Sequence, residues 1–136
     1  MKFFFDTCIS VRVVRALRHV LETEGGGKVC ELQHLSERYS DSSVPDVRWI
    51  ADLGVEGGWI IISGDPRISR GKAEKLAWKE SGLTAFFLSD GWAGGNIYSQ
   101  TADVIRRWPD IMRTARAHPL RRGFLITKAK EFREVF

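Results

Sequence analysis

Short apolar runs that alternate with longer amphipathic stretches constrain the fold of this chain more than any other feature of its sequence. Strands are expected at residues 2–5, 28–32, 59–62, 84–88 and 123–127. Residues 59–62 (WIII) form a continuous apolar run, which is typical of a strand buried on both faces. The pattern therefore predicts about five strands.

Helical spacing fills the stretches between these strands. After the first strand, apolar residues recur at Val11, Val14, Leu17 and Leu21. Further helices are expected from around residues 44–47 to Gly57, from Asp65-Pro66 to about Ser81, and from about Ile97 to Ala117. Alternating strands and helices predict right-handed βαβ units. We therefore expect an α/β fold, with a mainly parallel sheet of about five strands covered on both sides.

Composition places the chain among ordinary globular proteins. With 136 residues, 43% of them hydrophobic and 28% charged, it is most simply one domain over residues 1–136. We find no apolar run long enough to span a bilayer and no signal peptide, so a cytoplasmic protein without membrane contact is expected. Cys8 and Cys30 lack the spacing of a zinc site and are interpreted as reduced, buried cysteines.

Positive charge is concentrated in a basic helix and strand that begin at about residue 97. The net charge of the whole chain is only +4. Lys and Arg greatly outnumber acids between residues 106 and 133, and such a surface attracts nucleic acid. Charge alone leaves open a solvated helix face or a patch that an acidic partner neutralises. The residues expected to contact nucleic acid are Arg106, Arg107, Arg113, Arg116, Arg121 and Arg122.

Three aspartates are expected at one edge of the sheet. Asp6 and Asp65 each follow an apolar run and precede a predicted helix, and Asp46 lies at a helix start. The carboxyl ends of parallel strands meet at the same edge, where sites in such folds are found. Taken singly, each has a structural explanation as a helix cap, with Ser43 and Asp46 at the spacing of a capping box.

Taken together, the three aspartates favour a metal site. Clustered carboxylates repel one another unless a cation lies between them. A set of oxygen ligands without His or Cys favours Mg²⁺ or Mn²⁺, and such a metal activates water and stabilises charge on a phosphate during hydrolysis. Asp6, Asp46 and Asp65 are therefore the candidate catalytic and metal-binding residues.

The motifs around these acids resemble those of PIN-domain ribonucleases, and in particular VapC-type toxins of prokaryotic toxin–antitoxin systems. "MKFFFDTCIS" is similar to the first strand and first acid of the family, and "PDVRWIADL" to a helix start that carries a later acid. "WIIISGDPRI" is similar to the strand that ends in T-x-D-x-D-F. The resemblance covers about residues 1–80.

This resemblance implies a PIN-like Mg²⁺-dependent endoribonuclease, the toxin of a toxin–antitoxin pair. It implies Asp6, Asp46 and Asp65 as metal ligands, and Ser63 in place of the threonine that supports the last acid. The implied partners are RNA, a cognate antitoxin and a second copy of the chain.

The chain departs from the family pattern at two places within this region. The second acid, a Glu on a helix, has no clear counterpart, although Glu37, Asp41 or Asp90 remain candidates. The second Asp and the Phe of T-x-D-x-D-F are replaced by Arg67 and Ile68. The missing second acid favours the alternative that the chain is an inactive PIN-like module that binds nucleic acid or protein, whereas the retained trio of aspartates argues against it.

Other site classes fit less well. A haloacid-dehalogenase-type phosphatase needs an Asp where Cys8 lies, and the stretch Gly25-Gly26-Gly27-Lys28 lacks the Ser or Thr of a P-loop. The histidines (His19, His34 and His118) show no catalytic or metal spacing and are interpreted as surface or core residues.

Overall fold

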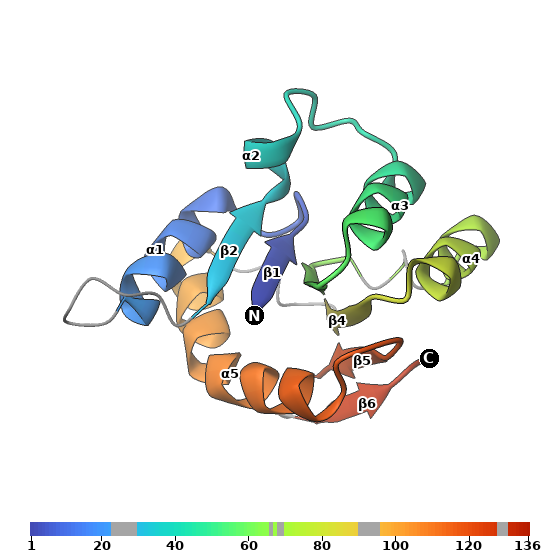
Figure 1. Ribbon diagram of the computed structural model, residues 1–136. Coiled ribbons are helices and arrows are strands. Elements are labelled where there is room, and N and C mark those ends of the chain that lie inside the picture. The colour runs from blue at the N-terminus through green and yellow to red at the C-terminus, as the bar shows by residue number, and fades with distance from the viewer. Residues whose placement is uncertain (23–29, 66, 68–69, 90–95, 128–130) are drawn as a thin grey trace.

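The computed structural model describes residues 1–22, 30–65, 67, 70–89, 96–127 and 131–136. Its elements follow the expected alternation of strand and helix (Figure 1). The strands are β1 (Lys2–Phe5), β2 (Glu31–His34), β3 (Trp59–Ser63), β4 (Thr84–Leu88), β5 (Gly123–Ile126) and β6 (Phe132–Glu134). The helices are α1 (Val11–Leu21), α2 (Leu35–Arg38), α3 (Asp46–Glu56), α4 (Lys72–Ser81) and α5 (Ile97–Ala117).

The described strands form one six-stranded sheet in the order β2-β1-β3-β4-β5-β6. Every neighbouring pair is parallel except β5 and β6, which are antiparallel. In the centre of the sheet, Phe5 of β1 lies beside Ile62 of β3. The next residues along the chain, Asp6 directly after β1 and Ser63 at the end of β3, therefore reach the same edge of the sheet together, which we call the carboxyl edge.

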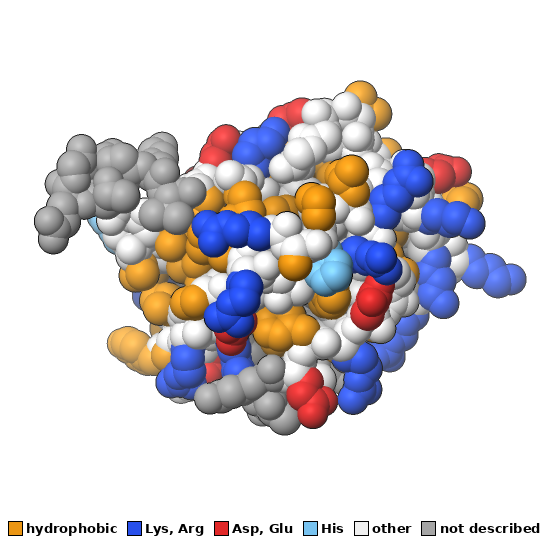
Figure 2. Space-filling model, turned by 60° about the horizontal axis from the view of Figure 1, so that its bottom comes forward, with side chains coloured by type: hydrophobic (Ala, Val, Ile, Leu, Met, Phe, Trp, Pro, Cys, Tyr) orange, Lys and Arg blue, Asp and Glu red, His pale blue; other side chains and the backbone are white. Residues whose placement is uncertain are grey.

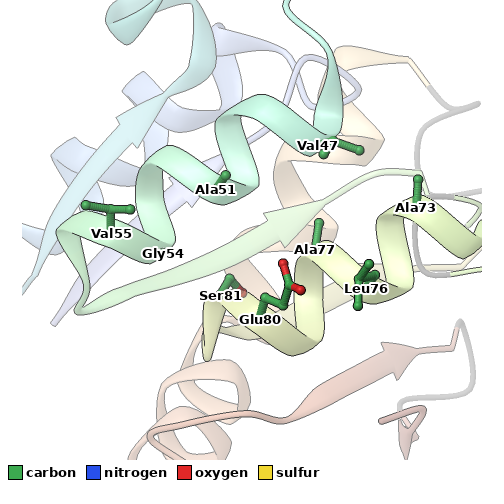
Figure 3. A pocket seen from close by; sticks show the side chains of 9 residues that line it. All are labelled: Val47, Ala51, Gly54, Val55, Ala73, Leu76, Ala77, Glu80 and Ser81. Atoms are coloured by element: carbon green, nitrogen blue, oxygen red, sulfur yellow. The ribbon is translucent and has the colours of Figure 1, made fainter.

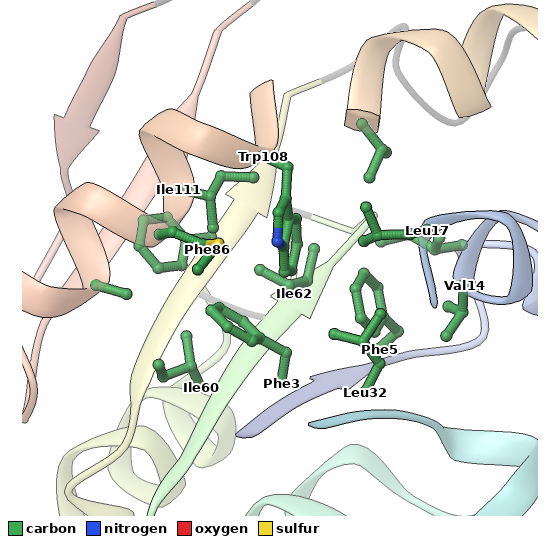
Figure 4. Packing of buried hydrophobic residues seen from close by; sticks show 14 of the residues in the cluster. Phe3, Phe5, Val14, Leu17, Leu32, Ile60, Ile62, Phe86, Trp108 and Ile111 are labelled. Atoms are coloured by element: carbon green, nitrogen blue, oxygen red, sulfur yellow. The ribbon is translucent and has the colours of Figure 1, made fainter. Parts of the chain in front are cut away.

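Helices cover both faces of the sheet, as a mainly parallel sheet requires. One face packs against α1 and α5, where Phe3 and Phe5 of β1 meet Leu17 and Trp108 (Figure 4). The other face packs against α3 and α4, where Phe4 of β1 belongs to a second buried cluster with residues of both helices. Alternate side chains of one short strand thus enter two cores, which explains why the run Phe3-Phe4-Phe5 is apolar throughout.

The predicted α/β fold is confirmed, with local differences at element ends. The third helix of the chain begins at Asp46 after Pro45, with no side-chain hydrogen bond at its cap, so the predicted Ser43–Asp46 capping box is wrong. The expected helix from Asp65-Pro66 begins at Lys72. Within the expected loop 36–43, residues 36–38 belong to α2, and β6 was not predicted. The glycines at 25–27 lie outside the described residues.

Of the described helices, even the longest, α5, lacks the apolar character that crossing a membrane requires.

Candidate functional site

Asp6 is a buried carboxylate that the ends of β1 and β3 hold in place. Its backbone N–H donates to the carbonyl oxygen of Ile62 at 3.2 Å, which extends the pairing of β1 with β3 by one residue. Its Oδ1 accepts hydrogen bonds from the backbone N–H groups of Cys8 at 3.1 Å and Gly64 at 3.2 Å. The Ser63 hydroxyl donates to Oδ2. With only 4% of its surface exposed, Asp6 has a fixed position and both oxygens engaged.

Burial makes the ionised form of Asp6 unfavourable. Desolvation raises the pKa of Asp6 to about 6, although the hydrogen bonds from Ser63, Gly64 and Cys8 oppose the shift. The negative charge of Asp46 raises this pKa further. The carboxylates of Asp6 and Asp46 are thus close enough to repel each other.

The Cys8 thiol lies within the electrostatic field of all three candidate acids. Desolvation and then the charges of Asp6, Asp65 and Asp46 raise the pKa of Cys8 to about 11, while Arg67 opposes them. In the structure Cys30 is buried and Cys8 is exposed, so the prediction that both cysteines are buried is correct for Cys30 and wrong for Cys8. Because one thiol senses the three aspartates, the structure brings Asp6, Asp46 and Asp65 to one region of the carboxyl edge.

Asp65 is held by an arginine two residues later in the chain. Arg67 donates from Nε to Oδ1 at 2.9 Å and from Nη2 to Oδ2 at 3.1 Å, and its backbone N–H donates to Oδ1 at 3.0 Å. The Arg67 side chain keeps the pKa of Asp65 below its usual range, and Arg70 contributes in the same direction. Both oxygens of this candidate metal ligand are therefore engaged by a cation of the chain itself.

Asp46 is the first residue of α3 and is half-buried. Its Oδ1 accepts a hydrogen bond from Trp49 Nε1 at 3.0 Å, which orients the carboxylate. A negative charge in the first turn is favourable there because helix N-termini carry a partial positive charge. The other oxygen, Oδ2, has no partner among the described residues and is the least constrained of the six carboxylate oxygens.

His34 holds the loop that follows β1, a role that the sequence did not indicate. Its Nδ1 accepts a hydrogen bond from the Ser36 backbone N–H at 3.1 Å, so the ring proton lies on Nε2. Nε2 lies 2.6 Å from the carbonyl oxygen of Ile9 and donates to it. His34 thereby fixes the turn between Asp6 and Ser10, the N-cap of α1. The available signal was its position between an apolar run and the pair Ser36 and Glu37.

None of the three candidates for a second acid joins the aspartates in the described part of the chain. Glu37 bonds to Arg18 and to the backbone N–H of His34, and Arg18 keeps its pKa low. Asp41 is exposed and accepts hydrogen bonds from Ser43. Asp90 lies outside the described residues.

The aspartates do not form a closed metal cage as the structure describes them. Among the described residues, no group of three His, Cys, Asp or Glu side chains is arranged to hold a metal ion. The ion pair between Arg67 and Asp65 gives a physical reason, because it directs the Asp65 carboxylate toward the guanidinium. The three aspartates thus lie in one region, but the carboxylate of Asp65 is bound to Arg67.

The six arginines expected to bind nucleic acid do not form one surface. Arg107 is buried, with 6% of its surface exposed, because its side of α5 faces the sheet. Three others form ion pairs: Arg106 with Asp103, Arg113 with Asp110, and Arg122 with Glu134. Arg116 and Arg121 are exposed and form no ion pair with a described residue. Because α5 ends next to Thr84, at the start of β4, its last arginines lie at the edge opposite Asp6.

A hollow of about 430 Å³ separates α3 from α4 (Figure 3). Val47, Ala51 and Val55 face it from α3, and Leu76, Ala77 and Glu80 face it from α4. The lining is almost entirely apolar, and the candidate acids are not part of it. This hollow therefore belongs to the packing of the two helices and not to the acidic region.

Comparison with known proteins identifies a family for this chain. A model of the family described as PIN like domain matches residues 1–90, a region that includes Asp6, Asp46 and Asp65. No curated protein and no solved structure matches the chain.

Proposed function

The chain belongs to the PIN-like domain family, and from this premise we propose that it is a divalent-metal-dependent endoribonuclease. The observation that carries the proposal is the convergence of Asp6, Asp46 and Asp65 around Cys8. Two of these acids follow parallel strands and the third opens a helix. A protein that needed them only as helix caps would gain nothing from bringing their charges together.

The donor chemistry of the three aspartates suits a hard cation. All candidate ligands are carboxylate oxygens, which Mg²⁺ and Mn²⁺ prefer. The pKa of Asp6 is raised in part by the charge of Asp46, a repulsion that a cation between them would relieve. The arrangement requires one adjustment, since Arg67 must leave Asp65 before that carboxylate can bind a metal. The Arg67 side chain is 83% exposed, so this movement meets little packing resistance.

The residues of the site then have distinct roles. Asp6, Asp46 and Asp65 would hold the cation, whose bound form supplies activation of water and neutralisation of charge on the scissile phosphate. Ser63 and the backbone N–H groups of Cys8 and Gly64 fix the orientation of Asp6. His34 fixes the loop that carries Cys8 and Ile9. These supports limit the movement of the buried ligand when a substrate binds.

The ion pair between Arg67 and Asp65 favours a second candidate function. If Arg67 stays on Asp65, the chain lacks one of its three acids, and it would act as an inactive PIN-like module that binds nucleic acid or protein. The two functions differ in a single measurable property, the dependence of RNA cleavage on metal and on the aspartates.

The test is RNA cleavage by the purified chain with Mg²⁺, with Mn²⁺ and with EDTA. We expect cleavage only with metal, and a loss of at least a hundredfold in rate for Asp6→Asn and for Asp65→Asn. Asp110→Asn on α5 is the matched control, because it removes the same charge from a helix that carries none of the three aspartates. Cleavage that persists in EDTA, or in both site variants, would exclude the metal-nuclease function.

We also propose the biological setting that the family resemblance implied. The chain would be the toxin of a toxin–antitoxin pair, bound by a cognate antitoxin and self-associated as a homodimer. Its expression should then arrest growth, and co-expression of a neighbouring small reading frame should relieve the arrest. Sedimentation of the purified chain tests the dimer. Growth that continues despite nuclease activity would contradict the toxin role alone.

A further inference from the structure

We propose that single-stranded RNA lies along α4, on a row of five cations that leads away from the aspartates. The row consists of Arg70, Lys72, Lys75, Lys79 and Arg121, and we call it the α4 row. This inference rests on the proposed nuclease function and identifies the surface that would hold the substrate. Of the six arginines expected from the sequence to contact nucleic acid, the α4 row includes only Arg121.

The three lysines of the α4 row share one face of the helix. Their spacing of three and four residues places Lys72, Lys75 and Lys79 one above another, and all three are exposed. At about 1.5 Å per residue, the first and last of them are about 10 Å apart along the axis. A phosphate backbone of repeating negative charge suits such a line of cations.

One end of the α4 row begins beside the candidate metal site. The positive charge of Arg70 helps to keep the pKa of Asp65 low, so the two side chains lie within electrostatic reach of each other. Gly71 then caps α4, and Lys72 is the first residue of the helix. A strand bound along the row would therefore pass directly from the lysines to the aspartates.

The other end of the α4 row opens into a hollow with an aromatic floor. The Arg121 backbone N–H donates to the Gly82 carbonyl oxygen at 3.1 Å, which holds this arginine beside the end of α4. Lys75, Lys79 and Arg121 border a hollow of about 510 Å³, which is lined by the half-buried ring of Phe136, with the buried ring of Trp78 packed behind it. Their stacked rings have centroids 6.2 Å apart. Cations around an aromatic surface are the combination that binds unpaired bases.

The cations of the α4 row are available for a ligand, whereas most of those on α5 are not. None of the five forms an ion pair with a described residue. On α5, by contrast, Arg106 is paired with Asp103 at 3.3 Å and Arg113 with Asp110 at 2.8 Å. A paired arginine must give up its carboxylate before it can bind a phosphate, so its net gain is smaller.

The space-filling view shows where the Lys and Arg side chains gather on the surface. Figure 2 is turned about the horizontal axis, so α4 and the C-terminus stay on the right-hand side of the molecule as in Figure 1. Lys and Arg side chains gather along that side, with few Asp or Glu between them. This side of the molecule is therefore rich in positive charge, which would guide a polyanion toward the site.

The experiment measures RNA affinity in the Asp6→Asn background, where cleavage does not consume the probe. A fluorescent single-stranded RNA is titrated at several salt concentrations with two triple variants of equal charge. One variant is Lys72→Gln, Lys75→Gln, Lys79→Gln on α4, and the matched control is Arg106→Gln, Arg113→Gln, Arg116→Gln on α5. Gln has nearly the helix propensity of Lys and Arg, so both helices should persist.

We expect the α4 triple variant to lose at least tenfold in affinity at about 0.1 M salt, with a salt slope smaller by about 2. The α5 triple variant should lose less than about threefold, and replacing the three lysines by Arg should retain binding. Equal losses in the two triple variants would overturn the proposal, as would displacement of the RNA by polyglutamate at equal charge. If the Asp6→Asn chain itself binds no RNA at low salt, the proposed function fails together with the α4 row.

Discussion

Arg67 engages both carboxylate oxygens of Asp65, through Nε at 2.9 Å and Nη2 at 3.1 Å. In the family pattern that the sequence resembles, the position of Arg67 carries a second Asp. The chain thus has a cation where PIN ribonucleases have an acid, and that cation neutralises the acid before it. A divalent metal at the proposed site would compete with Arg67 for the same carboxylate.

Removal of this competitor should strengthen metal binding. We expect Arg67→Gln to raise the affinity for Mg²⁺ by up to about fivefold, the range set by an exposed ion pair. Isothermal titration with Mg²⁺ measures the change without any RNA. Arg106→Gln, which breaks a similar exposed pair on α5, should leave the affinity unchanged. An unchanged or weaker affinity in Arg67→Gln would show that the pair does not restrict the site.

Ionisation of Asp6 should destabilise the metal-free protein as the pH rises. The folded-state pKa of about 6 lies above the ordinary value of 3.8, so the folded chain holds a proton that the unfolded chain has lost. The free energy of unfolding should therefore fall between about pH 4 and pH 6, by about 3 kcal/mol in total.

Asp6→Asn isolates this contribution, because asparagine cannot ionise. The variant should be more stable than the original chain above about pH 6, and the gap should narrow toward pH 4. Urea unfolding of both proteins without metal measures the difference at each pH. A gap that is constant with pH would contradict the raised pKa of Asp6.

His34→Ala should loosen the loop that follows β1. The substitution removes the donor to the buried Ile9 carbonyl oxygen and leaves a cavity, so we expect a loss of about 2 kcal/mol in stability. The affinity for Mg²⁺ should fall as well, since the loop carries the backbone N–H of Cys8 that orients Asp6. Denaturation and metal titration measure the two effects. His19→Ala, at an exposed position, should change neither by a comparable amount.

Gly64→Ala should disturb the contact between the loops after β1 and β3. A Cβ at residue 64 would lie 2.8 Å from the Cys8 Cβ and 3.2 Å from the Cys8 carbonyl carbon and oxygen. We expect a loss of about 1–3 kcal/mol in stability, because backbone atoms cannot move aside cheaply. Adding Cys8→Gly removes the closest atom and should restore part of the loss in a double-mutant cycle. Strictly additive effects would argue against this contact.

Sequence patterns predicted the layers of the fold and the meeting of the aspartates for one physical reason. Parallel strands end at a common edge, so an acid that follows an apolar run must lie at the carboxyl edge of the sheet. Asp6 and Asp65 follow this rule. The strand β3 was recognisable from its continuous apolar run, and the structure buries all of Trp59–Ser63.

Side-chain partners were less accessible to prediction, because pairs depend on rotamers and distant packing. Nothing in the sequence indicated that Arg67 would fold back on Asp65. Arg107 was expected at the surface because of its charge, although its spacing from Val104 and Ile111 places it on the buried face of α5. The role of His34 could not be predicted because its partner, the carbonyl oxygen of Ile9, lies 25 residues earlier in the chain. The strand β6 escaped notice because only the first of its three residues, Phe132–Glu134, is apolar.

The Cys8 thiol provides the most direct test of whether the three aspartates take up a divalent cation. Desolvation and then the charges of the aspartates raise its pKa to about 11, so its alkylation near pH 8 should be about a hundredfold slower than that of an ordinary thiol. Mg²⁺, which does not favour sulfur ligands, should lower this pKa and accelerate alkylation. The measurement is the pH profile of Cys8 alkylation, by mass spectrometry in a Cys30→Ser background, with and without Mg²⁺. A pKa that falls with Mg²⁺ in the original site, but not in Asp46→Asn or Asp65→Asn, is the predicted result; a pKa that saturating Mg²⁺ leaves unchanged would contradict metal binding by these aspartates.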